Sequence, residues 1–132
     1  MAGYLLDTGL VLRHLRGQRR VVQFLRHLSQ SEQLSVATVT RLEVHAGMRQ
    51  DERYATRKLL SRLAAYDLDR AIADKAGDLI AFGRSSGQNL SVPDAIIAAT
   101  AILNQLTLVT LNSDDFKHIS GLSVYHLDDD LQ

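Results

Sequence analysis

Short apolar segments alternate with helical patterns along the 132 residues of the chain. The strand-like runs are residues 4–7, 33–37, 106–109 and 122–126. Between them, apolar residues recur three or four positions apart, which is the period of a helix with one buried face. The helical segments are 9–15, 19–29, 40–49, 51–66, 70–84, 95–103 and 113–118. Such alternation predicts an α/β fold with a mainly parallel central sheet flanked by helices, and the length fits a single domain over residues 1–132.

Composition excludes several classes of protein. The chain has no cysteine, so disulfides, thiolate metal sites and cysteine nucleophiles are excluded. No segment approaches the roughly 18 apolar residues of a membrane span, and the first residues lack the basic and apolar regions of a secretion signal. We therefore expect a soluble cytoplasmic protein with no membrane partner.

Acidic residues stand where apolar runs meet polar, helix-starting ones. They are Asp7, Glu43, Asp94 and the adjacent pair Asp114 and Asp115. The carboxyl ends of parallel strands meet at one edge of a sheet, where open α/β sheets bind their ligands. Clustered carboxylates repel each other, and a divalent cation offsets that repulsion. A carboxylate set without sulfur suits Mg²⁺ or Mn²⁺, which also bind phosphate oxygens, so a phosphodiester is the natural substrate.

Each acid also has a purely structural interpretation. Asp7 and Asp94 are of the residue type that caps helix N-termini. Thr40 and Glu43 have the spacing of a capping box, in which the two side chains bond the first turn of a helix. On sequence alone the capping and metal-binding roles both remain open.

Two local strings match motifs of other enzymes. Leu5-Leu6-Asp7-Thr8-Gly9 resembles the active-site loop of aspartic proteases, but that fold is almost entirely β, whereas this chain is mostly helical in pattern. Gly83-Arg84-Ser85-Ser86-Gly87 fits the G-x-S-x-G string of serine hydrolases, which needs a strand before the serine. A helical pattern precedes it here, so we interpret the string as a helix end with Gly87 as the stop signal.

The zero net charge conceals an uneven distribution. Residues 1–62 hold eleven Lys and Arg against five Asp and Glu, and residues 63–132 hold four against ten. Arginine suits phosphate, so a polyanion could lie along the basic part. A solvated helix surface would produce the same pattern, because arginine is also a good helix former.

The strings around the acids resemble those of the PIN-domain nucleases, most closely the VapC-like toxins of prokaryotic toxin–antitoxin pairs. The likeness runs from Tyr4 to about Tyr125. The matching strings are Asp7-Thr8, Glu43 within Val39-Thr40-Arg41-Leu42-Glu43-Val44, Asp94 within Pro93-Asp94-Ala95-Ile96-Ile97-Ala98-Ala99, and the ending Thr110-Leu111-Asn112-Ser113-Asp114-Asp115-Phe116. In that ending Asp115 matches the family's acid, because it directly precedes Phe116. Gly9 departs from the family pattern, which more often has a small polar residue there.

The resemblance implies a three-layer PIN-like fold and a metal-dependent endoribonuclease that acts as a toxin. It implies catalytic and metal-binding roles for Asp7, Glu43, Asp94 and Asp115, with Mg²⁺ or Mn²⁺ as the cofactor. Supporting or substrate-positioning roles would fall to Thr8, Thr110, Asn112 and Asp114. The expected partners are RNA, a cognate antitoxin and a second copy of the chain in a homodimer. Two alternatives remain: a housekeeping RNA-processing nuclease, and a PIN-like module that binds RNA or protein without cutting.

Overall fold

The computed structural model describes residues 3–125, 127 and 131, and all structural statements below refer to this part of the chain. The strands are β1 (Tyr4–Leu6), β2 (Leu34–Ala37), β3 (Ala64–Tyr66), β4 (Thr107–Val109) and β5 (Ser123–Val124). The α-helices are α1 (Thr8–Leu15), α2 (Arg19–Ser29), α3 (Thr38–Gly47), α4 (Arg53–Ser61), α5 (Arg70–Ser85) and α6 (Val92–Leu103). Two 3-10 helices are η1 (Gln50–Glu52) and η2 (Ser113–Asp115).

All strands run parallel in one sheet of order β3-β2-β1-β4-β5. The chain builds the sheet outward from β1 through β2 to β3, and then returns to add β4 and β5 on the other side of β1. The direction of winding therefore reverses between β1 and β4. The carboxyl ends of these two strands form the crevice in which sheets of this kind bind ligands.

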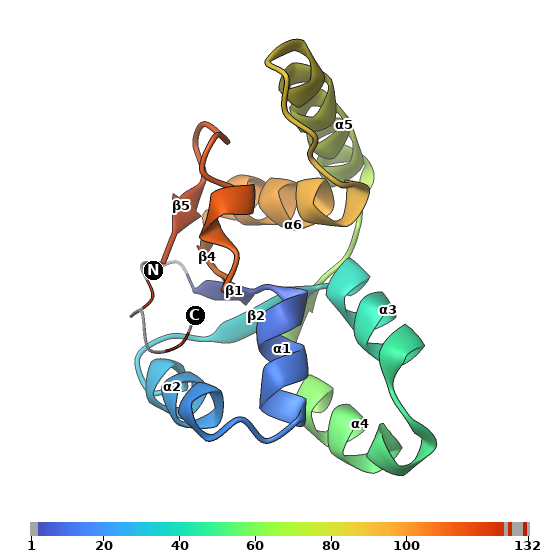
Figure 1. Cartoon of the computed structure of the whole chain (residues 1–132), viewed down its shortest axis with the longest axis vertical. Coiled ribbons are helices and arrows are strands. Elements are labelled where there is room, and N and C mark those ends of the chain that lie inside the picture. Colours follow the sequence, from blue (N-terminus) through green and yellow to red (C-terminus); the bar gives the residue numbers. More distant parts are fainter. Residues whose placement is uncertain (1–2, 126, 128–130, 132) are drawn as a thin grey trace.

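Helices cover both faces of the sheet, which confirms the predicted three-layer α/β arrangement. In Figure 1, α5 and α6 lie on one side of the strands, and α1, α2 and α4 lie on the other. Alternating strand residues feed the two cores, because successive side chains point to opposite faces. Leu6 and Val109 pack in one core with residues of α1, α2 and α4, whereas Leu5 and Leu108 pack in the other with α6.

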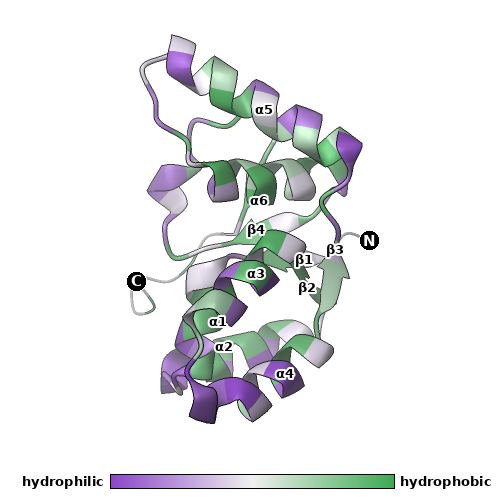
Figure 2. Cartoon of the chain, turned by 90° about the vertical axis from the view of Figure 1, so that its right-hand side faces the viewer, coloured by the Kyte–Doolittle hydropathy of each residue, from purple (hydrophilic) through white to green (hydrophobic). Residues whose placement is uncertain are grey.

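Helix α6 is the central element of its layer. It buries Ile97, Ala98 and Ala101 against the sheet and Ala95 and Ala99 against α5. Figure 2 shows hydrophobic colour along most of its length. A helix that is apolar nearly all round belongs between two layers, and this explains its sequence. No helix in the described ranges combines the length and apolar character that crossing a membrane requires.

Several predicted boundaries need correction. The helix expected at 51–66 is wrong at its end, because α4 stops at Ser61 and residues 64–66 form β3. This three-residue edge strand is defined by its pairing with β2, and pairing overrides a weak local preference. The helix expected at 113–118 is reduced to η2, and the strand expected at 122–126 is reduced to β5; its last predicted residue, His126, lies outside the described residues.

Candidate active site

Asp7 lies at the carboxyl end of β1 and begins the transition to α1. Its backbone N–H donates to the carbonyl oxygen of Val109 on β4 at 3.0 Å. Its side chain caps α1, since Oδ1 accepts from the backbone N–H of Thr8 at 2.8 Å. The other carboxylate oxygen, Oδ2, accepts from the hydroxyl of Thr110 at 2.6 Å. The capping interpretation of Asp7 is therefore confirmed, and both of its oxygens are held at the reversal point of the sheet.

Thr110 directly follows β4 and orients the Asp7 carboxylate from this neighbouring strand. It is buried, and its hydroxyl also accepts from the backbone N–H of Asn112 at 3.0 Å. The hydroxyl thus uses both its donor and its acceptor capacity. Asn112 contributes through its backbone, whereas its side chain is exposed.

Glu43 reaches the same edge from α3. The capping box proposed for Thr40 and Glu43 is wrong, because α3 begins at Thr38 after an Ala37 N-cap that makes no side-chain bond. Instead, the hydroxyl of Thr8 donates to Glu43 Oε1 at 2.7 Å and lies 3.0 Å from the hydroxyl of Thr40. Since a hydroxyl has one proton, Thr40 must donate to Thr8. This relay ties α1 to α3 and fixes the position of Glu43.

Asp94 occupies the first turn of α6. It is not the helix cap, because the side chain of Ser91 accepts from the Asp94 backbone N–H at 3.2 Å. The N-terminal end of a helix favours a negative charge nearby, and the half-buried carboxylate of Asp94 also has the Ser91 side chain as a hydrogen-bond partner. The helix starts three residues earlier than predicted, with Pro93 in its first turn, where proline is well tolerated.

The charges at this edge influence one another. Burial is the largest cause that raises the pKa of Asp7; hydrogen bonds from Thr110 and Thr8 oppose it, and the charges of Glu43 and Asp115 add to it. Burial also raises the pKa of Asp94 most, followed by the charge of Asp7, with smaller increases from Asp115 and Glu43. Four carboxylates therefore share one electrostatic environment.

Asp115, rather than its neighbour Asp114, faces this group. The charge of Asp115 raises the pKa of both Asp7 and Asp94. Asp114 has a side chain that is 91% exposed, and it pairs with Lys117 at 3.8 Å. The buried side chain of Phe116 anchors the segment that follows η2. This arrangement agrees with the sequence argument that chose the acid next to Phe116.

The donor set fits a hydrated hard cation. Within the described residues, no three His, Asp or Glu side chains converge closely enough to hold a metal ion by themselves. Mg²⁺ keeps several waters and is usually bound by one or two carboxylates together with substrate phosphates. Carboxylates whose burial and neighbouring charges raise the pKa of Asp7 and Asp94 suit that mode of binding, and they do not suit a closed structural zinc site.

Two residues that position the acids were not identified as such from the sequence. Thr40 was interpreted as part of a capping box, and Ser91 was assigned no role. The Thr40–Thr8 contact spans 32 residues, so no local pattern could reveal it. Ser91 had a usable signal, since a serine three residues before an acid and ahead of an apolar run is typical of a helix start. At Gly9, the departure from the family pattern, an added Cβ would meet no atom within 4 Å. A small side chain would therefore fit there.

Comparison with known proteins agrees with this geometry. The PIN domain family matches residues 4–122. Ribonuclease VapC10 of Mycobacterium tuberculosis is 32% identical over 108 residues, which cover 82% of this chain and 81% of that protein. The structure of a toxin–antitoxin complex from Klebsiella pneumoniae contains a chain that is 30% identical, with a TM-score of 0.78 over 95% of this chain and 100% of that one.

A DNA-bound VapBC structure from Salmonella typhimurium contains a chain with a TM-score of 0.84 and 22% identity, over 95% of this chain and 98% of that one. At that identity the likeness concerns the fold alone, and it reproduces the three-layer architecture described above. Sequence match, sheet order and the placement of the acids lead to the same assignment. The chain belongs to the PIN-domain family.

Proposed function

We propose that this protein is a Mg²⁺- or Mn²⁺-dependent endoribonuclease and the toxin of a toxin–antitoxin pair. The observation that carries the proposal is the shared electrostatic environment of Asp7, Glu43, Asp94 and Asp115 at the reversal point of the sheet. Relatives named as a ribonuclease and as part of a toxin–antitoxin complex support it. The expected products carry a 3′-hydroxyl and a 5′-phosphate.

The side chains divide the work in this proposal. Asp7 and Asp94 would hold the cation, directly or through water, while Glu43 and Asp115 would hold a second ion or orient the attacking water. A bound divalent cation offsets charge on the scissile phosphate and makes water a stronger nucleophile. The hydroxyl of Thr8 fixes Glu43 from α1. Such supporting groups keep reactive oxygens within the narrow geometry that catalysis requires.

The basic part of the chain supplies the attraction for RNA that the acidic centre lacks. Eleven of the 15 Lys and Arg residues fall within residues 1–62, which include α1, α2 and α4. Contacts between these side chains and phosphates make binding depend steeply on salt concentration. An antitoxin that covers the acidic edge and a second copy of the chain complete the proposed assembly.

Conservative substitutions of the acids test the catalytic proposal. Asp7→Asn and Asp94→Asn should each lower RNA cleavage more than about a hundredfold, because losing a metal ligand exceeds the 10–100-fold cost of losing a supporting group. Asp115→Asn should also lower it, and by more than the adjacent Asp114→Asn, because the Asp114 side chain is 91% exposed and pairs with Lys117. Circular dichroism would verify that each variant folds. Full activity of Asp7→Asn and Asp94→Asn in Mn²⁺ would refute the proposal.

The toxin role requires a separate test. Expression of the wild-type chain should arrest growth, and co-expression of the protein encoded by the neighbouring upstream gene should relieve the arrest. The Asp7→Asn variant should not arrest growth. RNA cleavage in vitro without growth arrest, or an arrest that the neighbouring protein leaves unchanged, would instead favour the housekeeping nuclease.

A further inference from the structure

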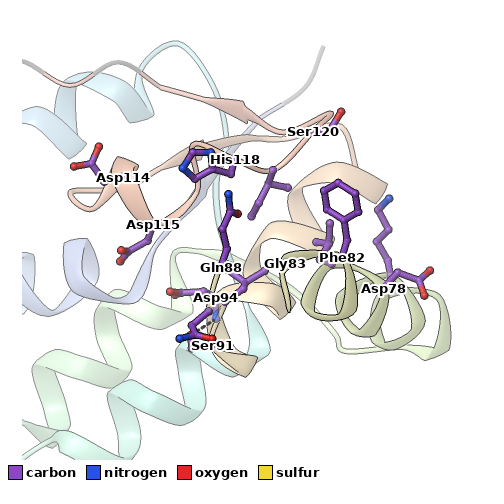
Figure 3. A pocket seen from close by; sticks show the side chains of 15 residues that line it. Asp78, Phe82, Gly83, Gln88, Ser91, Asp94, Asp114, Asp115, His118 and Ser120 are labelled. Carbon is purple, nitrogen blue, oxygen red and sulfur yellow. Dashed lines mark hydrogen bonds between the residues drawn. The ribbon is translucent and has the colours of Figure 1, made fainter. Parts of the chain in front are cut away.

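A pocket of about 710 Å³ opens directly beside the acidic centre. It lies between the carboxyl half of α5, the segment that leads into α6, and the η2 loop. Asp94 and Asp115 belong to its wall, so the pocket and the acidic centre are continuous. Figure 3 shows these two acids toward one side of the pocket and Phe82 toward the other, with Gln88 between them. A substrate cleaved at the acids would therefore place a neighbouring group in this pocket.

The lining of the pocket combines one exposed aromatic ring with apolar and polar groups. Phe82 projects from α5 and remains 65% exposed. Leu79 and Ile119 supply partly buried apolar surface, and Gln88 and His118 supply polar groups from two different loops. Small-molecule sites are typically lined in this way, with apolar surface and a few polar groups that fix orientation.

A tight helix end holds Gln88 at the pocket. The backbone N–H of Gln88 donates to the carbonyl oxygen of Gly83 at 2.7 Å. A Cβ at Gly83 would approach the Gln88 carbonyl oxygen to 3.3 Å, and Gly87 adopts a φ of +76°. Glycine adopts such positive φ values without strain. The G-x-S-x-G string therefore serves a structural purpose, which is to end α5 in a tight turn and place Gln88 in the wall of the pocket.

The charges of the pocket disfavour a phosphate and favour an uncharged base. Its wall carries four acids, Asp78, Asp94, Asp114 and Asp115, and one lysine, Lys75. Carboxylate and amide oxygens accept hydrogen bonds from the exocyclic amino groups of nucleobases. An aromatic face stacks on any base. A base in a duplex could not enter, because it is already stacked and paired, so the occupant must be unpaired.

We propose that this pocket binds the base of one unpaired nucleotide adjacent to the cleaved phosphodiester, which stacks on Phe82 and bonds to Gln88. The inference rests on the proposed ribonuclease function and adds to it a base-recognition site formed by Phe82 and Gln88 beside the acids. In this proposal Phe82 and Gln88 recognise the base of the substrate, and the acids contribute to cleavage at the phosphate.

Abasic substitution in the substrate tests the proposal. The probe is a synthetic single-stranded RNA that copies a mapped cleavage site, with one base at a time removed from the nucleotides flanking the cut. For the wild-type protein, removal of one particular base should lower kcat/KM on the order of tenfold, the typical effect of losing a stacked base. Phe82→Ala should lower kcat/KM on the intact RNA by a similar factor and lose its sensitivity to that base, and Phe82→Trp should restore both.

Among the described residues, a second exposed aromatic side chain of comparable size provides a matched control. Tyr54 on α4 is 78% exposed and does not line this pocket. Tyr54→Ala should retain the wild-type sensitivity to the abasic site. Equal sensitivity in wild type and Phe82→Ala, or no sensitive position in wild type, would overturn the proposal. A change in oligomeric state of Phe82→Ala without a change in abasic sensitivity would also overturn it, since Phe82 would then contact another chain.

A binding measurement separates failure of this inference from failure of the proposed function. The inactive Asp7→Asn protein is titrated with the same RNA carrying the fluorescent base 2-aminopurine next to the cut. Stacking on Phe82 should change the fluorescence, and Phe82→Ala in the same background should abolish that change. If wild type cuts no RNA, the ribonuclease proposal fails; for that case, 2-aminopurine is placed at each position of a generic single-stranded RNA. A response that depends on Phe82 supports the pocket assignment, and its absence at every position overturns it.

Discussion

The carboxyl edge of the sheet and the helical layer formed by α1, α2 and α4 differ in whether their buried polar atoms have hydrogen-bond partners. At the edge, Asp7, Thr40 and Thr110 are buried and take part in side-chain hydrogen bonds. In the helical layer, Nδ1 of His14 and Oγ1 of Thr56 are buried without a hydrogen-bond partner in the described part of the chain. An unsatisfied buried polar atom costs roughly 1–3 kcal/mol. The molecule therefore provides hydrogen bonds for its buried polar groups where chemistry is proposed. It leaves buried polar atoms unpaired where only packing is needed.

Helix α1 joins the two regions and shows the contrast at its two ends. Asp7 caps its beginning, where the helix dipole favours a negative charge, and His14 lies in its last turn, where the dipole favours a positive one. At His14 the dipole does not prevail: burial lowers its pKa most, and the charges of Arg26 and Arg62 lower it further. Burial disfavours the charged side chain at both ends of α1, but only at Asp7 do hydrogen bonds, from Thr110 and Thr8, oppose it.

The largest expected difference between the regions comes from the same substitution at two buried threonines. Thr110→Val removes the donor to Asp7 Oδ2 and the acceptor for the Asn112 N–H. It should destabilise the protein by roughly 1–3 kcal/mol and lower cleavage activity about 10–100-fold. Thr56→Val removes a hydroxyl that has no partner, so it should leave activity unchanged and stabilise the protein by up to about 1 kcal/mol.

Urea denaturation and RNA cleavage assays on both variants check this pair. If Thr56→Val destabilises the protein as much as Thr110→Val, the two buried hydroxyls are equivalent and the contrast between the regions fails. If Thr110→Val resists urea better than wild type but still loses activity, the role of the Thr110 hydroxyl is confined to orienting Asp7.

The same contrast explains what the sequence could and could not predict. The positions of Asp7 and Asp94 at helix starts were predictable, because each marks a local change from an apolar strand or a loop to a helix. The Thr8–Glu43 bond joins residues 35 positions apart, and the local capping-box spacing of Thr40 and Glu43 led to the wrong role. Tertiary contact overrode a local pattern in that case, as pairing with β2 did at β3.

The pocket beside the site had no sequence signal for a similar reason. Gln88 and His118 come from loops 30 positions apart, and only the packing of α5, α6 and the η2 loop brings them to one cavity. The turn at Gly83 and Gly87 was predictable as a helix end, and the structure confirms it. That this turn places Gln88 at the pocket could not be inferred from the string itself.

The next prediction concerns the energetic consequence of burying Asp7. Its pKa is raised above the ordinary value of 3.8, so the folded state binds a proton more readily than the unfolded chain. The stabilising contribution of Asp7 is full below pH 3.8 and is lost as pH rises through the folded-state pKa. At neutral pH without metal, Asp7→Asn should therefore be more stable than wild type, on the order of 1 kcal/mol.

Urea denaturation in EDTA from pH 3.5 to 7.5 measures this difference. The advantage of Asp7→Asn should appear as pH rises and then remain constant. Addition of Mn²⁺ should stabilise wild type more than the variant, because a ligand stabilises the state that binds it. A variant that is less stable than wild type at neutral pH in EDTA would show that the hydrogen bonds of Asp7 outweigh its burial.

The smallest predicted effect is the contribution of His14 to stability, and its dependence on pH is opposite in sign to that of Asp7. Its pKa is lowered from the ordinary value of 6.5, so the unfolded chain binds a proton more readily than the folded state. The contribution of neutral His14 is full above pH 6.5 and is lost as pH falls from there through the folded-state pKa. Relative to His14→Gln, wild type should lose stability between pH 7.5 and 5, by less than about 1 kcal/mol because the group is only partly shielded from solvent.

Arginine substitutions test whether burial and the charges of Arg26 and Arg62 together keep His14 uncharged in the helical layer. Arg26→Gln and Arg62→Gln each remove a positive charge that lowers the pKa of His14, so each should weaken the acid-dependent loss, and the double variant should weaken it further. Burial is the larger cause, and part of the loss should therefore persist in the double variant. If the loss disappears, the arginine charges dominate. If both single variants behave like wild type, burial alone excludes charge from this end of α1.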